Sequence, residues 1–318
     1  MQPFVSKMWR LSGVIVGLGG LTIALVTVLQ IPSISDSELQ TVSPPSPQPQ
    51  KNLPLQYKTY TLAHSMVHTL LIPAQSSFAV VPALSESVDT LDSFAKPYGA
   101  IAVLNGGFFD PTNQKSTSYA VLEGKLVADP RLNERLINNP DLSPYLNQIF
   151  NRTEFRRYQC GSTFRYDITP HNAPLPTNCQ LIDALGGGPR LLPELTAQPE
   201  AFVDTVNGEV IRDPLGISQP NARTAIALTH AGDIVWVMVA QKPEVPTNSG
   251  MTFAELITFL QTLGVKQAMN LDGGSSSSFY YQGKTWYGKV DPEGYPVQRP
   301  VKSVLLVLPK ESDRRTAP

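Results

Sequence analysis

Residues 270–278 of the chain read Asn270-Leu271-Asp272-Gly273-Gly274-Ser275-Ser276-Ser277-Ser278. A helix signal and a short apolar run precede them, so we expect a loop at the end of a buried strand. Gly273 and Gly274 permit positive φ and close approach of the backbone to a ligand. The carboxylate of Asp272, the hydroxyls and free backbone N–H groups suit a sugar or an anion. The alternative is a Gly/Ser-rich turn with a solvated carboxylate.

Two further glycine-rich loops follow apolar runs that predict buried strands. The first run leads into Asn105-Gly106-Gly107-Phe108-Phe109-Asp110, and the second leads into Gly186-Gly187-Gly188-Pro189-Arg190. Strand ends on a rigid sheet often carry site residues, so we expect all three loops to converge on one cleft. The alternatives are a hairpin turn at Asn105-Gly106 and a tight bend at the three glycines.

The rest of the pattern predicts a single α+β domain, with a mixed central β-sheet and flanking helices. Thr252 and Glu255 form a capping box for a helix over 253–263, whose apolar residues share one face. A second short helix is expected over 87–95, capped by Ser87. Short β-prone runs between turn residues supply the strands, among them 57–63, 66–72, 78–82, 224–229 and 234–240.

Composition narrows the functional classes. The chain has 42% hydrophobic and 16% charged residues, enough apolar material for a sizeable core, and a net charge of −1. This balance gives no support for nucleic-acid binding through a basic surface. The sequence has no Gly-x-Ser-x-Gly, His-Glu-x-x-His or phosphate-loop motif, and its four histidines leave few candidates for a histidine-based mechanism.

The N-terminal region predicts export. Lys7 and Arg10 precede an uncharged run over 11–31, long enough to cross a bilayer core of about 30 Å. We expect a cytoplasmic stub and transmembrane anchor over 1–31, with the domain on the extracytoplasmic side, periplasmic or extracellular. A cleaved signal peptide and a buried core helix are the alternatives. The other expected parts are a Pro/Ser-rich linker over 32–56, the domain over 57–310 and a polar tail over 311–318.

Residues 129–178 are polar, proline-containing and less regular than their surroundings, so we expect an insertion that packs over the core. Export would place Cys160 and Cys179 in an oxidising compartment, where a disulfide is the default. Two buried free thiols are the alternative. Two cysteines are too few for a structural zinc site.

The three loops and several flanking segments together resemble the phosphodiester glycosidase family, which includes the enzyme that uncovers mannose 6-phosphate and many bacterial envelope proteins. The resemblance runs in family order from about residue 100 to residue 308. Two features depart from the family pattern: Ser275 replaces a common third glycine, and the insertion is longer. The matching segments are Asn105-Gly106-Gly107-Phe108-Phe109, Gly187-Gly188-Pro189-Arg190-Leu191-Leu192, Arg223-Thr224-Ala225-Ile226-Ala227, Met251-Thr252-Phe253-Ala254-Glu255-Leu256, Asn270-Leu271-Asp272-Gly273-Gly274-Ser275-Ser276 and Arg299-Pro300-Val301.

The resemblance implies hydrolysis of a sugar-1-phosphodiester at the anomeric C–O bond, on an envelope or exopolysaccharide glycan. Positive charge develops on the sugar as that bond breaks, so Asp272 is the expected catalytic carboxylate. Arg223 is expected to grip the phosphate through two N–H groups, and Asn105 to orient a hydroxyl or a water. The expected substrate-binding residues are Gly106, Gly107, Asp110, Gly188, Arg190, Gly273, Gly274, Ser275, Ser276 and Arg299.

Two other functions stay open at this point. A non-catalytic glycan-binding or polysaccharide-assembly protein could share the fold, because a fold does not fix activity. An ordinary glycoside hydrolase would need two carboxylates flanking the bond, and Asp110 is the second candidate. The pattern assigns no metal ligands and no cofactor, and it leaves open whether a divalent cation bridges carboxylate and phosphate.

Overall fold

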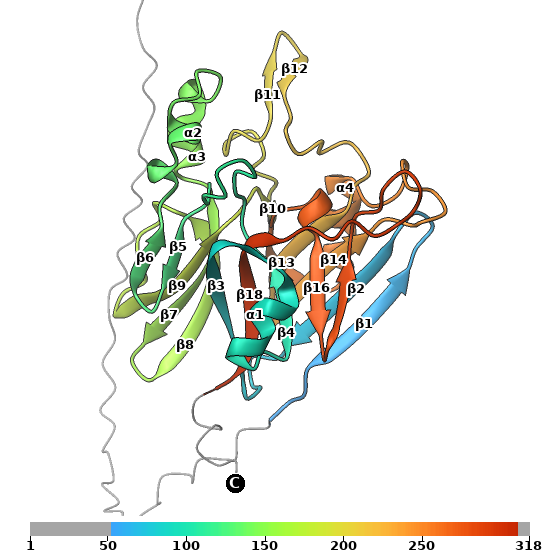
Figure 1. The fold of residues 1–318 in the computed structure, drawn as a ribbon. Helices are drawn as coiled ribbons and strands as arrows, with labels where there is room; N and C mark the ends of the chain where they lie inside the picture. Colours follow the sequence, from blue (N-terminus) through green and yellow to red (C-terminus); the bar gives the residue numbers. More distant parts are fainter. Residues whose placement is uncertain (1–51, 311–318) are drawn as a thin grey trace, which may run out of the picture. The chain divides into compact units, whose positions relative to one another are not determined.

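The computed structural model describes residues 52–310 of the chain. The predictions of an anchor over 1–31 and of a polar tail over 311–318 lie outside these residues, as does most of the linker predicted over 32–56. Within residues 52–310, no helix is both long and apolar enough to cross a membrane. Figure 1 shows the arrangement of the elements.

Three antiparallel sheets build the described domain (Figure 1). The first sheet has six strands in the order β1 (Gln56–Thr61), β2 (Met66–Ile72), β14 (Ile234–Ala240), β13 (Arg223–Thr229), β15 (Val265–Asn270) and β10 (Arg190–Leu192). The second has five, in the order β17 (Lys284–Tyr287), β16 (Ser278–Tyr281), β4 (Ala102–Asn105), β18 (Val301–Pro309) and β3 (Phe78–Asp89). The third also has five, in the order β6 (Lys125–Ala128), β5 (Ala120–Leu122), β9 (Cys179–Gly186), β7 (Thr153–Cys160) and β8 (Thr163–Pro170).

One apolar core joins all three sheets. Leu70 and Ile226 enter it from the first sheet, Leu104 from the second, and Phe155 and Leu185 from the third. Each of these side chains is at most 2% exposed. Burial of this shared core therefore couples the three sheets, because apolar area removed from water is the main stabilising contribution to folding.

Two longer helices cover the outer sides of the first two sheets. Helix α4 (Phe253–Thr262) begins at the predicted capping box, where Thr252 and Glu255 each accept a hydrogen bond from the other's backbone N–H. Its apolar face packs on strands of the first sheet. Helix α1 (Leu91–Tyr98) packs on the second sheet through Phe94 and Ala95.

The predicted α+β class with a mixed sheet is wrong for the structure described. Strands dominate residues 52–310, and every named strand pair there is antiparallel. Helix α4 lies between β14 and β15 in the chain, but these two strands are not neighbours in the sheet. Instead β13 lies between these two strands and pairs antiparallel with both.

The predicted helix over 87–95 is also displaced. Ser87 and Val88 belong to strand β3, which runs on to Asp89 beside β18. The N-cap is Thr90, whose hydroxyl accepts a hydrogen bond from the Ser93 N–H. The longer pairing with β18 therefore delays the start of the helix.

The predicted insertion over 129–178 is more regular than its sequence suggested. It begins with short helical turns, then forms the hairpin of β7 and β8, which supplies two strands of the third sheet. Cys160 and Cys179 lie opposite each other on β7 and β9, and their disulfide confirms the predicted bond. The short turns are η1 (Pro130–Leu132), α2 (Glu134–Ile137), η2 (Ser143–Tyr145) and α3 (Leu146–Ile149). A separate two-stranded hairpin joins β11 (Asp204–Val206) to β12 (Glu209–Arg212).

Candidate active site

Asn105 connects the ends of several strands beneath the loop that holds Asp272. It is fully buried at the end of β4. Its Nδ2 donates to the Asp272 carbonyl at 2.7 Å, and its Oδ1 accepts from the Thr224 hydroxyl at 2.8 Å and the Ser278 N–H at 3.0 Å. These bonds engage both ends of the amide, so Asn105 holds the Asp272 loop in place.

In chain order, the three glycine-rich loops are the first (Asn105–Asp110), the second (Gly186–Arg190) and the third (Asn270–Ser278). The first and third loops are in direct contact. The Asp272 N–H donates to the Gly106 carbonyl at 3.0 Å. The next amide along, that of Gly107, donates to the Ser303 hydroxyl at 3.0 Å. A side chain at Gly107 would collide with the Gly186 carbonyl of the second loop. Glycine is needed here because two backbones pass without room for a Cβ.

The second loop closes the arrangement from the other side. The Gly188 N–H donates to the Asn270 carbonyl at 2.8 Å, and Asn270 Nδ2 donates back to the Gly188 carbonyl at 2.9 Å. The Gly187 N–H donates to the Thr153 carbonyl at 2.9 Å. The predicted convergence of the three loops is therefore confirmed. The first loop leaves β4 of the second sheet, the second connects β9 of the third sheet to β10 of the first, and the third leaves β15 of the first sheet.

Asp272 is the partly buried carboxylate at this meeting point. Burial raises the pKa of Asp272 from 3.8 to about 6, against the opposing effects of the Ser276 hydroxyl, the Arg299 charge and the Gly273 N–H. Loss of hydration disfavours the charged form, and these three groups offset that cost only in part. Asp272 is thus a carboxylate at neutral pH, but one that is poorly solvated and close to protonation.

Arg299 supplies the positive charge beside Asp272. Its Nη1 donates to the Ser275 hydroxyl at 2.8 Å, and its guanidinium carbon lies 5.2 Å from the centre of the Phe109 ring. Among residues 52–310, no carboxylate lies within ion-pair distance of Arg299. Its remaining N–H groups are consequently available to an anionic ligand.

The guanidinium of Arg223 faces the protein instead. The side chain is 3% exposed, and burial lowers its pKa to about 10. Four N–H bonds of 2.7–2.9 Å end on backbone carbonyls, those of Leu215, Gly216, Gln219 and Met251. Arg223 follows Ala222, whose carbonyl accepts from the Gly274 N–H at 2.8 Å. The structure therefore puts Arg223 next to the Asp272 loop, but with only one N–H left over and no fork facing a phosphate.

Asp110 and Arg190 lie at the edges of the loops and are engaged elsewhere. Burial disfavours ionisation of Asp110, but the Thr112 N–H and the Arg135 guanidinium outweigh it and hold its pKa below the usual range. The Arg135 Nε lies 2.8 Å from the carboxylate. The Arg190 side chain donates to the Glu194 carbonyl at 3.5 Å. Asp110 is thus the partner of an ion pair, which does not favour a role as a second catalytic carboxylate.

Within residues 52–310, no group of three or more His, Cys, Asp or Glu side chains is placed to hold a metal ion.

The sequence analysis missed the serine hydroxyls that hold the first loop. Besides Ser303 on Gly107, the Ser118 hydroxyl accepts from the Phe108 N–H at 3.1 Å. Both serines are under 10% exposed. An isolated serine in or beside a strand carries no motif, so no signal in the sequence marked them.

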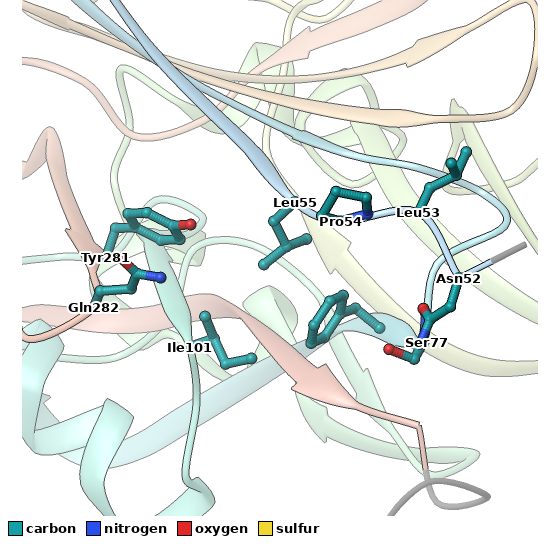
Figure 2. A pocket seen from close by; sticks show the side chains of 9 residues that line it. Asn52, Leu53, Pro54, Leu55, Ser77, Ile101, Tyr281 and Gln282 are labelled. Atoms are coloured by element: carbon teal, nitrogen blue, oxygen red, sulfur yellow. The ribbon is translucent and has the colours of Figure 1, made fainter.

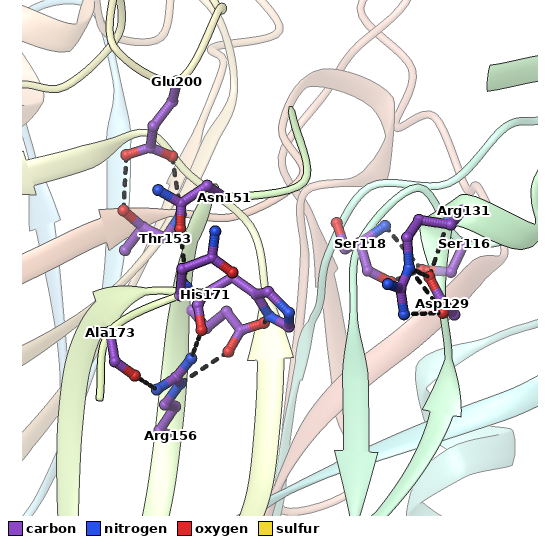
Figure 3. A network of polar contacts seen from close by, with 12 residues as sticks. Ser116, Ser118, Asp129, Arg131, Asn151, Thr153, Arg156, His171, Ala173 and Glu200 are labelled. Carbon is purple, nitrogen blue, oxygen red and sulfur yellow. Dashed lines mark hydrogen bonds and ion pairs between the residues drawn. The ribbon is translucent and has the colours of Figure 1, made fainter. Parts of the chain in front are cut away.

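A second polar network lies beside the second loop (Figure 3). The buried Glu154 accepts from Arg156 Nε at 2.8 Å and lies 2.5 Å from His171 Nδ1. The His171 ring stacks on Tyr119 with 3.7 Å between centres. Glu154 pairs with Gly186 across β7 and β9. This network stiffens the strand end from which the second loop departs.

The fold and site together define a class of protein: three antiparallel sheets that bring glycine-rich strand ends around one desolvated carboxylate and one uncompensated arginine. The chain belongs to the phosphodiester glycosidase family, whose model matches residues 98–308. The predicted family is confirmed, and with it the predicted class of enzyme, hydrolases that act on sugars linked through a phosphodiester. No curated protein matches the chain significantly.

Three solved structures share the fold at low identity. A hypothetical protein from Synechocystis has 16% identity and a TM-score of 0.53, over 80% of this chain and 61% of that one. The catalytic domain of zebrafish N-acetylglucosamine-1-phosphodiester alpha-N-acetylglucosaminidase, auto-inhibited by its pro-peptide, has 17% identity and a TM-score of 0.57, over 80% and 82%. A putative exported protein from Burkholderia pseudomallei has 15% identity and a TM-score of 0.55, over 77% and 74%. The present chain therefore spans 61% of the length of the Synechocystis protein.

Proposed function

We propose that this protein hydrolyses the bond between an anomeric carbon and a phosphodiester oxygen, in a glycan of the cell envelope or an exopolysaccharide. The observation that carries the proposal is the placement of a desolvated Asp272 carboxylate near Arg299, which has no ion pair within 4.0 Å among the described residues. The family match supports the reaction class.

The two charges have complementary tasks in this reaction. As the C–O bond breaks, positive charge grows on the sugar ring, and the Asp272 carboxylate stabilises it. Because that carboxylate is poorly hydrated, its field on the developing charge is stronger than it would be in water. Asn105 fixes the backbone of Asp272, and the Ser276 hydroxyl and the Gly273 N–H donate to its carboxylate, so the carboxylate needs little reorganisation during the reaction.

The leaving group is a phosphate monoester, which leaves with its negative charge and needs no strong acid. It does need compensation of that charge, and Arg299 with the Ser275 hydroxyl is the suitable pair near Asp272. In this proposal Arg223 has a positioning role. It fixes the carbonyls around residues 215–219 and the strand beside Gly274.

We also propose that the domain acts on the extracytoplasmic side. The Cys160–Cys179 disulfide supports this location, because such bonds persist in oxidising compartments.

Isotope tracing tests the reaction directly. The purified protein is incubated with a p-nitrophenyl sugar-1-phosphodiester in ¹⁸O-water, and the products are analysed by mass spectrometry. Cleavage at the anomeric carbon puts ¹⁸O in the free sugar, whereas attack at phosphorus puts it in the phosphate. Label in the phosphate would contradict the proposal, and so would saturable binding of the probe without any product. The second outcome would instead indicate the glycan-binding alternative.

A further inference from the structure

Two arginines outside the Asp272 cleft converge on one carbonyl oxygen. Arg212 Nε donates to the Ala201 carbonyl at 2.8 Å, and Arg152 Nη2 approaches the same oxygen at 3.5 Å. Arg152 Nε also donates to the Glu200 carbonyl at 3.0 Å. Ala201 itself adopts a positive φ of 53°, a conformation that is costly for a residue with a side chain. The backbone is thus held in an unfavourable conformation that brings the two guanidiniums together.

No carboxylate of the described residues forms an ion pair with either arginine, although the nearby Glu200 carboxylate stabilises the charge of Arg152 from a greater distance. Among residues 52–310, none lies within ion-pair distance of Arg152 or Arg212. The Glu200 carboxylate is bonded to Thr153, Thr196 and the Arg190 N–H. The Asp204 carboxylate, opposite Arg212 in the β11–β12 hairpin, accepts the Tyr145 hydroxyl at 2.6 Å.

Aromatic rings fix both guanidiniums. The guanidinium carbon of Arg152 lies 3.7 Å from the centre of the Phe202 ring, and that of Arg212 lies 5.0 Å from the Tyr145 ring. Each guanidinium has five N–H groups, and Arg212 uses one of them on the described chain. Burial lowers the pKa of Arg152 to about 9; the Glu200 carboxylate opposes this change and the neighbouring charge of Arg212 adds to it. Like charges held together in this way are stabilised when an anion binds both.

One aromatic side chain, Phe202, lies between Arg152 and the first loop of the candidate site. The Phe202 ring that supports Arg152 is 5.5 Å from the ring of Phe108. The adjacent Glu200 carboxylate lies against Gly188, where a Cβ would collide with it. The arginine pair therefore adjoins the loops Asn105–Asp110 and Gly186–Arg190 of the candidate site.

We propose that Arg152 and Arg212 form an anion subsite that takes a second phosphate group of the substrate. This inference rests on the proposed function, because a glycan whose sugars are joined through phosphodiesters carries further phosphates at regular distances from the bond that is cut. Two guanidiniums presenting several N–H groups match the geometry of phosphate oxygens. The substrate class that follows is a polyanionic glycan with repeated phosphates.

Calorimetric titration of the full-length protein with inorganic phosphate tests the subsite without requiring turnover. Arg212→Gln should weaken phosphate binding at least about tenfold, as expected when a charge-assisted contact is lost. Arg212→Lys should recover only part of the affinity. Arg165→Gln is the matched control, since it removes the same charge from an exposed position on β8, and it should change the affinity less than about twofold. Arg152 is more buried than Arg212, so its substitution could disturb folding. Arg152→Lys is therefore the second variant, because it keeps the positive charge.

Repeating the titrations in an Arg299→Gln background removes the phosphate ligand proposed for the cleft and isolates the subsite. Phosphate affinity in Arg212→Gln equal to that of the unmodified protein would overturn the proposal, as would acetate binding as tightly as phosphate. Loss of binding in Arg212→Gln from a protein that releases no sugar would support the subsite and reject the proposed hydrolysis. If Arg212→Gln kept its phosphate affinity and the protein did release sugar, the proposed hydrolysis would be supported and the subsite rejected.

Discussion

The two ends of strand β4 differ sharply in chemistry. One end is Asn105, where three glycine-rich loops gather around a carboxylate and an arginine. The other end begins just after Ile101, which lines a cavity of about 410 Å³ (Figure 2). The residues around that cavity are uncharged and mostly apolar: Asn52, Leu53, Pro54, Leu55, Ser77, Phe78, Ile101, Tyr281 and Gln282.

This difference shows that the volume of a cavity does not identify the reactive site. Bond cleavage at an anomeric carbon needs charge placed against developing charge, and only the Asn105 end of β4 supplies it. That charge is placed by backbone contacts between loops, in which Gly106 accepts from the Asp272 N–H and Gly188 donates to the Asn270 carbonyl. Variants at the two ends of β4 should therefore separate chemistry from packing.

The largest effect is expected from Asp272→Asn, which keeps the size of the side chain and removes its negative charge. Turnover of a sugar-1-phosphodiester should fall by at least about 10³-fold, the scale of losing a key electrostatic group. Binding of the intact substrate should survive. Steady-state kinetics measure both, and Asp110→Asn is the matched control, with an expected loss below about tenfold. Near-normal turnover by a folded Asp272→Asn protein would end the assignment.

Arg299→Gln should have the next largest effect, because it removes the charge that faces the leaving phosphate. We expect kcat/KM to fall about 10- to 100-fold, the range for one charge-assisted hydrogen bond. Arg299→Lys should recover part of the rate. Substrates with better leaving groups should depend less on this residue. If the loss were the same for good and poor leaving groups, Arg299 would not act on the leaving phosphate.

The pH dependence should follow Asp272. Its pKa is raised from 3.8 to about 6, so kcat/KM should fall about tenfold per pH unit below about 6, as the reactive carboxylate is lost. Stability should change in the opposite direction. The folded state keeps the proton between pH 4 and 6 and the unfolded state does not, so this group destabilises the fold as pH rises through that range. Asp272→Asn should remove this slope and raise the melting temperature at pH 7.

Arg223→Lys should affect stability more than catalysis. An ammonium cannot reach four carbonyls that are arranged around a guanidinium. We expect the free energy of unfolding to fall by about 2–3 kcal/mol, since buried carbonyls lose charged donors. Among folded molecules, kcat/KM should stay within about tenfold. Denaturant unfolding with parallel kinetics checks both, and a large loss of turnover without loss of stability would restore the catalytic role first expected for Arg223.

The smallest effect is expected at the opposite end of β4. Ile101→Phe adds volume beside the cavity while keeping the backbone bond from residue 101 to the Val307 carbonyl. Turnover should stay within about twofold. A loss greater than about tenfold, with an unchanged melting temperature, would mean that this cavity takes part in the reaction.

Local sequence signals predicted the parts of the molecule whose causes are local. The capping box located the start of α4. The glycine pairs located the three loops, because close backbone contacts demand glycine wherever they occur.

Structural features that depend on contacts between residues far apart in the sequence could not be predicted from local patterns. Strand β7 carries Glu154 and Arg156, and their charges concealed a buried strand because each neutralises the other only once the sheet has formed. The orientation of Arg223 could not be predicted, because segments near residues 216 and 251 enclose its guanidinium. The bonds of Asn105 to the Asp272 carbonyl, the Thr224 hydroxyl and the Ser278 N–H join residues that are far apart in the sequence.

The segment Gly186–Gly188 connects two sheets, since Gly186 ends β9 of the third and Arg190 begins β10 of the first. Its amides are bonded to Thr153 on one side and Asn270 on the other. Opening of the third sheet would therefore expose amides beside Asp272, so these groups should exchange their hydrogens with solvent as one cooperative unit. A ligand bound beside Asp272 would therefore slow the exchange of amide hydrogens along β7. Exchange in the β7–β8 hairpin would then measure ligand binding, although the hairpin does not contact the ligand.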